Sequence, residues 1–564
     1  MIVMGKPFSK VTTVAVTVIL LFLQLVGMDL IGCSSAQPIQ LFTPSGYQSY
    51  YVLGNSSMII KEAVDVAVEF DPDDAQPYSV FSIVSYQNKS RIYVDQKGNG
   101  YSFNSSDFTG ADAVFELDKG GVLILDNWAS PYYEITPAGR GSLVSGSLGP
   151  VDGGDYFFIA GGPVNVFRGA TDRQSEAGPD GNYVAGMWEL YPVELGGSSA
   201  QRNYVVPVGE DTPGTGDFNG SDSRRGGTYL VVQATEDSTL VNYTLQGAPM
   251  NRTLSRGESF VISHVWQGDV LNSNRRVQVG LIGSGGKQYD IRYFTLKDAN
   301  FTRYDYWIPT FPSSFPAMNV RFHVFAVTDA VVTIDTRWGV AAGWSGKAMS
   351  AGSVDTSFTT NGTTPVHIYA GEGERFLILV SMSTNTGDRD WGYVPVDRTC
   401  YALEYFIPYA PSGKNASRDM QLYVTPVFDG TTVFADYDQD GVAEENVTLD
   451  RLESHGFFDS SDMDNTGTHL YADFPFTVVY GESVYAEIGG NLAGYDWGYT
   501  LIPLECAYFN TALNATKMAD PTVSPINGSV AFTTSVSSGN YTIQGVDVWD
   551  VLPPGFGYVN GSTM

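Results

Sequence analysis

The residues with the clearest potential for chemistry lie in one acidic run, residues 436–444. Carboxylates stand at alternate positions and are followed by a glycine and one more carboxylate: Asp436, Asp438, Asp440, Gly441 and Glu444. This spacing lets one tight loop direct several oxygen atoms at a hard cation, and calcium takes about six to eight oxygen ligands. The run therefore predicts a calcium site.

Two more carboxylates, Asp462 and Asp464, follow along the sequence and are expected to complete the ligand shell. The spacing differs from that of the EF-hand loop, which has a bidentate glutamate at its last position. A hairpin turn rich in Asp and Gly that needs no metal would contain the same residue types. At the level of the sequence both interpretations stay open.

The common catalytic motifs do not occur in the sequence: Gly-x-Ser-x-Gly, His-Glu-x-x-His, Cys-x-x-Cys and the P-loop are all absent. The five histidines are scattered without the spacing of metal ligands: His264, His323, His367, His455 and His469. The 61 acidic residues would allow an acid–base pair, but the sequence singles out none. We expect that the protein is not an enzyme and that it holds no cofactor other than calcium.

The string Asp-Trp-Gly-Tyr occurs twice, at 390–393 and at 496–499. Its aromatic residues would suit a platform on which sugar rings stack: Trp391, Tyr393, Trp497 and Tyr499. A tryptophan that recurs with a repeat more often packs in the core or at a junction between modules. We favour packing and keep a glycan platform as the alternative.

Cys400 and Cys506 occupy corresponding positions after successive repeats, whereas Cys33 belongs to the N-terminal segment. An even pair of cysteines in an exported chain can form a disulfide. Equivalent positions in two repeats can also lie too far apart for such a bond. A disulfide and two buried thiols are both open.

The elements that position these residues belong to a repeated module. Three short strings are near-copies of one another: Tyr204-Val-Val-Pro207, Tyr306-Trp-Ile-Pro309 and Tyr405-Phe-Ile-Pro408. Their prolines are 102 and 99 residues apart (309 − 207 and 408 − 309). About 100 residues is the size of one compact β-domain, so most of the chain is interpreted as one module used four times.

Composition favours strands, since 13% of residues are aromatic, only 16% are charged and 62 are glycine. Beyond the N-terminus we find no sustained helical period of apolar residues. We predict an all-β fold of tandem β-sandwich modules, with a propeller-like closed ring as the alternative. The predicted boundaries are a signal peptide at 1–36, module 1 at 37–195, module 2 at 198–298, module 3 at 299–397, module 4 at 398–510 and a partial immunoglobulin-like domain at 511–564.

The N-terminus has the order of a secretory signal: Lys6 and Lys10, an apolar run at 14–28, then small residues. Cleavage after Ala36 is the favoured outcome. The string that ends at Cys33 also resembles a lipobox, which would leave that cysteine lipidated. An uncleaved signal anchor is a third option. All three place the rest of the chain outside the cytoplasm.

Surface chemistry agrees with export. The balance of 31 basic against 61 acidic residues, a net charge of −30, repels nucleic acid and anionic lipid and favours cations. Acceptor triplets for N-glycosylation are spread along the chain at Asn55, Asn88, Asn104, Asn219, Asn242, Asn251, Asn300, Asn361, Asn415, Asn446, Asn514, Asn527, Asn540 and Asn560. We expect a glycoprotein.

Module 4 looks like segments of large prokaryotic surface proteins that precede immunoglobulin-like repeats, and the residues that carry the resemblance are 431–441, 449–452, 458–464, 467–472 and 501–503. The glycine–strand–glycine pattern of residues 467–481 is similar to the N-terminal region of IgGFc-binding-type proteins. In the tail, Met518 to Phe532 and the string Asp-Val-Leu-Pro-Pro-Gly that begins at Asp550 resemble an immunoglobulin-like repeat of the "domain of unknown function eleven" type. The resemblance implies a β-sandwich cut short at Met564, so we expect that a longer protein continues it or that a partner completes it.

These features predict an exported glycoprotein of the cell surface or extracellular matrix, acting in adhesion, envelope coating or structural assembly. A carbohydrate-binding or carbohydrate-processing surface protein is the alternative. The expected partners are other surface proteins, like subunits or glycans, and not nucleic acid. Contact with a membrane is expected only through a signal anchor, a lipid at Cys33 or a C-terminal anchor beyond this sequence.

Overall fold

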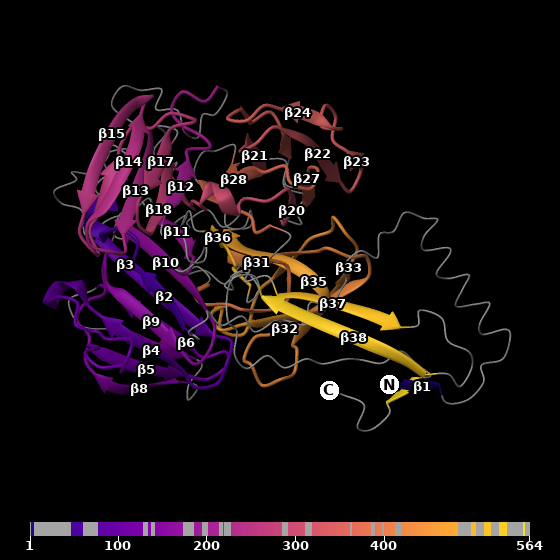
Figure 1. Cartoon of the computed structure of the whole chain (residues 1–564), viewed down its shortest axis with the longest axis horizontal. Coiled ribbons are helices and arrows are strands. Elements are labelled where there is room, and N and C mark those ends of the chain that lie inside the picture. Colours follow the sequence, from indigo (N-terminus) through magenta and orange to yellow (C-terminus); the bar gives the residue numbers. More distant parts are fainter. Residues whose placement is uncertain are drawn as a thin grey trace. The chain divides into compact units, whose positions relative to one another are not determined.

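The structure is a computed structural model, and nearly all of its elements are antiparallel strands (Figure 1). It describes residues 2–4, 47–59, 77–127, 133–136, 141–172, 185–193, 201–213, 218, 227–284, 291–310, 318–360, 364–384, 390–397, 400–411, 420–482, 498–503, 513–520, 529–538 and 556–558. The chain divides into two compact units, one made of Met1–Ser45 with Phe509–Met564 and the other of Gly46–Tyr508. The prediction of an all-β fold is confirmed.

Module 2 shows the repeated unit in its simplest form. Its strands are β12 (Arg202–Val205), β13 (Gly227–Ala234), β14 (Thr239–Leu245), β15 (Ala248–Leu254), β16 (Ser259–Ile262), β17 (Val270–Ser273), β18 (Val277–Ser284) and β19 (Ile291–Thr295). One sheet has the order β12-β17-β14-β15 and the other β16-β13-β18-β19. The chain crosses between the two sheets, which gives a two-layer sandwich.

Module 3 repeats this order, β20-β27-β22-β23 in one sheet and β25-β21-β28-β29 in the other. Its strands are β20 (Asp305–Ile308), β21 (Met318–Ala326), β22 (Ala330–Thr336), β23 (Gly339–Val340), β24 (Lys347–Met349), β25 (Val354–Asp355), β26 (Thr359–Thr360), β27 (Val366–Tyr369), β28 (Phe376–Thr384) and β29 (Asp390–Tyr393). The short strands β24 and β26 add to the two sheets, pairing with β22 and β21.

Module 1 has the same order with two inserted edge strands, β2-β9-β4-β5-β8 and β11-β10-β3-β6-β7. Its strands are β2 (Tyr47–Tyr51), β3 (Pro77–Ser85), β4 (Ser90–Asp95), β5 (Ala113–Leu117), β6 (Val122–Asp126), β7 (Tyr133–Thr136), β8 (Gly141–Gly146), β9 (Tyr156–Ala160), β10 (Val164–Asp172) and β11 (Ala185–Leu190). The insertions β7 and β8 make module 1 longer than the others.

Module 4 fuses the two layers through one long strand. Its strands are β30 (Ala402–Phe406), β31 (Met420–Pro426), β32 (Thr431–Asp436), β33 (Glu445–Leu449), β34 (His455–Phe457), β35 (His469–Glu482) and β36 (Gly498–Thr500). The first part of β35 pairs with β32 and the second part with β31 and β36, so that both layers belong to one seven-stranded sheet. The strand order of the module is otherwise unchanged.

The four modules contact one another in a closed cycle. Their last strands lie together, β11 against β19, β19 against β29, β29 against β36, and β36 against β11. Each buried core also takes in residues of a neighbour: module 1 with module 2, module 2 with module 3, module 3 with module 4, and module 4 with module 1. Both predicted arrangements therefore hold at different levels, because the units are sandwiches and their contacts close a ring.

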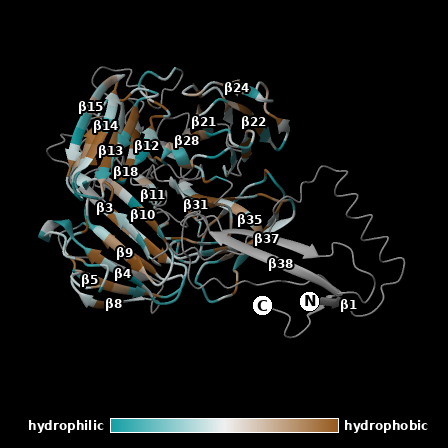
Figure 2. Cartoon of the chain, viewed as in Figure 1, coloured by the Kyte–Doolittle hydropathy of each residue, from teal (hydrophilic) through white to brown (hydrophobic). Residues whose placement is uncertain are grey.

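This arrangement explains two kinds of strand in the sequence. The sheets that carry the last strands face their own partner sheet on one side and a neighbouring module on the other, so β13 is buried at every position. The other sheets have one solvent face, and β17 accordingly alternates between exposed and buried positions. Figure 2 shows the apolar residues concentrated on the strands of the modules.

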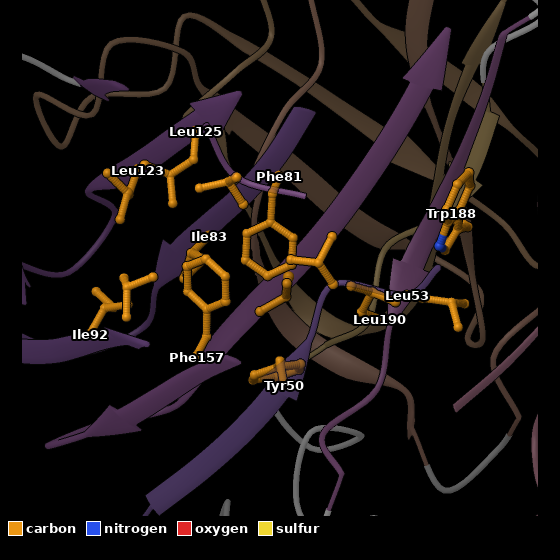
Figure 3. Packing of buried hydrophobic residues seen from close by; sticks show 14 of the residues in the cluster. Tyr50, Leu53, Phe81, Ile83, Ile92, Leu123, Leu125, Phe157, Trp188 and Leu190 are labelled. Carbon is orange, nitrogen blue, oxygen red and sulfur yellow. The ribbon is translucent and has the colours of Figure 1, made fainter. Parts of the chain in front are cut away.

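The core of module 1 illustrates the packing (Figure 3). Phe81 of β3 and Phe157 of β9 come from opposite sheets, and their rings stack at 4.3 Å between centroids. At the edge of this core Trp188 stacks on Tyr293 of module 2 at 5.1 Å, which continues the core into the neighbouring module. Burial of this kind contributes about 25 cal/mol per Å² of apolar surface.

The unit made of Met1–Ser45 with Phe509–Met564 contains a four-stranded sheet in the order β37-β38-β1-β39. Its strands are β1 (Ile2–Met4), β37 (Leu513–Asp520), β38 (Ser529–Ser538) and β39 (Phe556–Tyr558). The segment predicted as a partial immunoglobulin-like domain supplies three of them, and β1 comes from the predicted signal segment. Among the described residues, no helix is both long and apolar enough to cross a membrane.

Candidate metal centre

The acidic run forms the loop of a hairpin between β32 and β33, residues 436–444. Gln439 and Gly441 have φ angles of 59° and 91°, which turn the chain sharply enough to gather its side chains. Four residues bring carboxylate oxygens within 4.8 Å of one another: Asp436, Asp438, Asp440 and Glu444. Four negative groups this close repel one another, and a cation between them would remove that repulsion.

Asp436 is the buried member of the group, with 2% of its surface exposed. Its Oδ2 accepts a hydrogen bond from the backbone N–H of Gly441 at 3.0 Å. Its Oδ1 is buried and has no hydrogen-bond partner among the described residues. A buried carboxylate oxygen without a partner is costly, so this atom fits a metal ligand.

The other three carboxylates each accept one backbone N–H of the loop. Asp438 accepts from Asp440 at 3.0 Å, and Asp440 from Val442 at 2.7 Å. Glu444 accepts from Tyr437 at 2.7 Å. These bonds hold the loop in shape, and each carboxylate still has lone pairs for a cation. The oxygen-only donor set suits calcium better than a transition metal.

Asp462 and Asp464 are not members of this group. They belong to a second turn, where Asp462 accepts the N–H of Asp464 at 2.9 Å and Asp464 accepts the N–H of Thr466 at 2.8 Å. The four-residue group thus lacks the two additional carboxylates that the sequence suggested. Water or both oxygens of one carboxylate would have to supply the remaining calcium ligands.

The tip of the acidic loop lies against module 1. The Nε2 atom of Gln439 donates to the carbonyl oxygen of Gly120 in module 1 at 2.8 Å, and also to that of Gly467. Gly120 has a φ of 76°, and a side chain there would overlap Gln439. A hollow of about 420 Å³ lies beside this contact, lined by residues of both modules, including Asp436 and Lys119.

Charged contacts surround the same junction. Lys119 of module 1 forms an ion pair with Glu404 of module 4 at 2.6 Å, and Glu404 also contacts His469 at 2.8 Å. These partners lower the pKa of the Glu404 carboxyl, although burial opposes the shift. The acidic loop is therefore placed where the first and last modules of the ring meet.

The aromatic residues of the Asp-Trp-Gly-Tyr strings are buried, and Trp391, Tyr393 and Tyr499 are each no more than 2% exposed. A side chain at Gly481 or Gly498 of module 4 would overlap the Trp391 ring. The Tyr393 hydroxyl donates to Pro309 O at 2.6 Å. A glycan platform is therefore wrong for these three residues, and Trp497 lies outside the described residues.

Cys400 is buried and disulfide-bonded. Cys506 lies outside the described residues, so its pairing with Cys400 stays a prediction. The surroundings of Cys400 include Tyr191, Val396 and Ile502, which lie just after the last strands of modules 1, 3 and 4. The bonded cysteine therefore lies where several modules end.

Six predicted glycosylation sites have exposed side chains: Asn88, Asn104, Asn242, Asn251, Asn300 and Asn446. Asn55 is partly buried and donates to Asp152 at 3.0 Å. The remaining acceptors fall where side chains are not described: Asn219, Asn361, Asn415, Asn514, Asn527, Asn540 and Asn560. Asn242 and Asn251 are direct cross-strand partners on β14 and β15, so two glycans there would share one exposed face.

Sequence reasoning missed a charged cluster at the centre of the ring. Lys297 of module 2 lies 3.4 Å from Asp397 of module 3, and both side chains are less than 10% exposed. The Lys297 ammonium also lies 5.1 Å from the ring centroid of Tyr191 in module 1. Glu189 of module 1 is buried beside them, and burial raises the pKa of its carboxyl to about 8. Each residue lies near the end of a module's last strand or just after it, which is the one signal that could have grouped them.

No family model matches the sequence, and no curated protein matches it. The resemblance to prokaryotic surface proteins thus stays a prediction.

Proposed function

We propose that this protein is an exported, N-glycosylated structural protein of the cell surface or extracellular matrix. In this proposal the four β-sandwich modules act as one rigid body that presents its outer sheets and glycans to other surface molecules. The observation that carries the proposal is the closed cycle of module contacts, in which every core continues into a neighbour. A body of this kind suits a load-bearing or coating role, because no module can move without disrupting a shared core.

Calcium is the second part of the proposal. The four carboxylates of the loop 436–444 would bind one calcium ion, with the buried Oδ1 of Asp436 as the innermost ligand. Gln439 in the same loop donates a hydrogen bond to Gly120 of module 1. An ion bound at this loop would therefore also stabilise the contact between modules 1 and 4. Extracellular modules bind calcium with dissociation constants of about 0.1–1 mM, and a cell exterior supplies such concentrations.

The calcium part is tested by thermal unfolding and calorimetric titration of the full chain. Calcium at a large excess over its dissociation constant should raise the melting temperature by stabilising only the folded state, and EDTA should reverse this. Asp438→Asn should abolish the shift, whereas the control Asp464→Asn, outside the four-residue group, should keep it. An equal shift in wild type and Asp438→Asn, or none in either, would refute calcium binding at this loop.

The export part is tested in cells of the source organism. Protease added to intact cells should degrade the protein, and removal of N-glycans should increase its electrophoretic mobility. Recovery in the cytoplasmic fraction with unchanged mobility would contradict the proposal.

A further inference from the structure

A hollow of about 530 Å³ lies at the junction of modules 1 and 2, away from the acidic loop. Module 1 contributes the side of β2 and β9 that faces away from its own core, together with the segment around Phe103. Module 2 contributes the turns that connect β13 to β14, β15 to β16 and β17 to β18. Its volume is within the range of about 300–1,000 Å³ typical of sites for small ligands.

The floor of this cleft is aromatic. Alternation along β2 and β9 points Tyr47, Tyr51, Tyr156 and Phe158 to the same side of the sheet. The ring centroids of Tyr47 and Phe158 are 4.6 Å apart and those of Tyr51 and Tyr156 are 4.9 Å apart. Phe103 joins the two pairs, at 5.2 Å from Phe158 and 6.4 Å from Tyr156, whereas Tyr51 and Phe158 are themselves buried. Tyr47, Tyr156 and Phe103 remain partly exposed. Aromatic faces of this kind pack against the C–H groups of a sugar ring.

Arg256 stands over this floor in a cage of tyrosines. Its guanidinium carbon lies 4.1 Å from the ring centroid of Tyr101 and 4.8 Å from that of Tyr156. Its Nε donates to the Tyr51 hydroxyl at 2.6 Å, while its Nη atoms form no hydrogen bond with the described residues. The side chain is thus oriented and still has donors for a carboxylate, the group that a guanidinium binds in bidentate fashion.

The remaining wall of the cleft carries both basic and acidic side chains. Arg275 and Arg276 also line the cleft, as do Glu236 and Asp237. Arg275 pairs with Glu236 at 2.9 Å. Arg256 thus stands beside further guanidinium groups in a chain with 31 basic and 61 acidic residues. A ligand for this cleft needs an anionic group, hydroxyl donors for the carboxylates and an apolar face for the floor.

We infer that the cleft between modules 1 and 2 binds an acidic saccharide, a pyranose ring that carries a carboxylate. The sugar carboxylate would pair with Arg256, its hydroxyl groups would donate to Glu236 and Asp237, and its C–H face would lie on the tyrosines. An acidic peptide meets the first requirement but offers few hydroxyl donors. The strong net negative charge of the protein disfavours a polyanion such as nucleic acid. This activity goes beyond the proposed structural role and uses a different site.

Calorimetric titration of the full chain with a galacturonic acid trisaccharide tests the inference, with the neutral galactose trisaccharide and hexaglutamate as comparison ligands. The acidic trisaccharide should bind, and Arg256→Gln should weaken binding about tenfold or more, because a charge-assisted hydrogen bond is lost. Ser105 is exposed on the rim, so Ser105→Glu should also weaken binding by repulsion without disturbing the core. Arg252→Gln serves as the matched control, since Arg252 pairs with Glu258 outside the cleft.

The outcomes separate the alternatives. Binding of the acidic trisaccharide that both cleft variants weaken and Arg252→Gln leaves unchanged supports the inference. Equal binding of the neutral trisaccharide would overturn the role of Arg256, and tighter binding of hexaglutamate would overturn the ligand class. Absence of acidic-saccharide binding, or binding that neither Arg256→Gln nor Ser105→Glu changes, would overturn the site itself. Calcium binding at the loop 436–444 is unaffected by any of these results.

Discussion

Single residues tie the two layers of each module together. In modules 1 to 3, the hydroxyl of a tyrosine in the first strand donates to a backbone carbonyl at the start of a strand in the opposite sheet, and in module 4 the corresponding tyrosine donates to a carbonyl in the middle of β35. The pairs are Tyr50 with Val164, Tyr204 with Val277, Tyr306 with Phe376 and Tyr405 with Phe476, at 3.4, 2.8, 2.9 and 2.8 Å. The hydrogen bond explains why the tyrosine of the repeated string is retained, since it satisfies a buried carbonyl between layers.

The buried carboxyl of Glu189 leads to a prediction about how the stability of the fold depends on pH. Burial raises the pKa of its carboxyl to about 8, against an ordinary value of 4.5, while Lys297 and the backbone N–H of Thr500 partly oppose the shift. The folded state therefore keeps a proton that the unfolded chain releases as pH rises between these values. This carboxyl destabilises the fold increasingly over that window, by about 1.4 kcal/mol per pH unit.

Glu189→Gln should remove this loss. Relative to wild type, the free energy of unfolding of Glu189→Gln should rise between pH 6.5 and 8, as measured by urea denaturation. The window starts at 6.5 because burial also raises the pKa of Asp155 to about 6, which acts in the same direction at lower pH. Exposed Glu372 provides the control variant Glu372→Gln. A pH-independent difference between Glu189→Gln and wild type would show that Glu189 is already ionised in the fold.

At the scale of elements, glycines in the last strands make room for aromatic rings of neighbouring modules. A Cβ atom at Gly392 of β29 would lie 2.6 Å from Phe294 of β19, and one at Gly498 of β36 would overlap Trp391 of β29. In the copy of the Asp-Trp-Gly-Tyr string at 390–393, Trp391 thus packs against module 4, and Gly392 leaves room for Phe294 of module 2.

Gly498→Ala should therefore destabilise the protein through one methyl group. Overpacking of a well-packed core costs about 1–3 kcal/mol, which thermal unfolding would detect as a lower melting temperature. Trp391→Phe in the same chain should recover part of the loss, because the smaller ring leaves space. Gly98→Ala is the matched control, since no atom lies within 4 Å of its Cβ position. Equal melting temperatures for Gly498→Ala and wild type would contradict the packing described here.

The elements were largely predictable from the sequence. Continuous apolar runs such as that of β28 mark strands buried on both faces, and alternating runs such as that of β22 mark strands with one solvent face. The fourth copy of the tyrosine string was missed because the segment that begins at Tyr50 lacks the proline of the others. The acidic loop was found for the same local reason as the strands, because its spacing lies within one hairpin.

Contacts across the whole molecule could not be predicted in this way. Lys297 and Asp397 are 100 residues apart, and Gln439 and Gly120 are 319 residues apart. No local pattern specifies which modules become neighbours, because that depends on the shape of complete outer and inner sheets. The turn of Asp462 and Asp464 shows the same limit on a smaller scale, since proximity in sequence did not bring these side chains into the four-residue group.

The contact between modules 1 and 4, which closes the cycle of modules, leads to a prediction at the scale of the whole molecule. Gln439→Asn keeps a residue that tolerates the positive φ of this position but shortens the side chain that reaches Gly120 and Gly467. The lost hydrogen bonds should cost about 1–3 kcal/mol and loosen the contact between modules 1 and 4. Hydrogen exchange should then accelerate at the Gly120 amide, which donates to Ser85 O at 2.7 Å, and remain unchanged at the junction of modules 2 and 3.

Calcium should slow hydrogen exchange at Gly120 in wild type more than in Gln439→Asn if the loop transmits ion binding to the contact between modules 1 and 4. Equal acceleration of hydrogen exchange at both junctions would show instead that the modules unfold as one cooperative unit, and that the contact of Gln439 with Gly120 does not open independently.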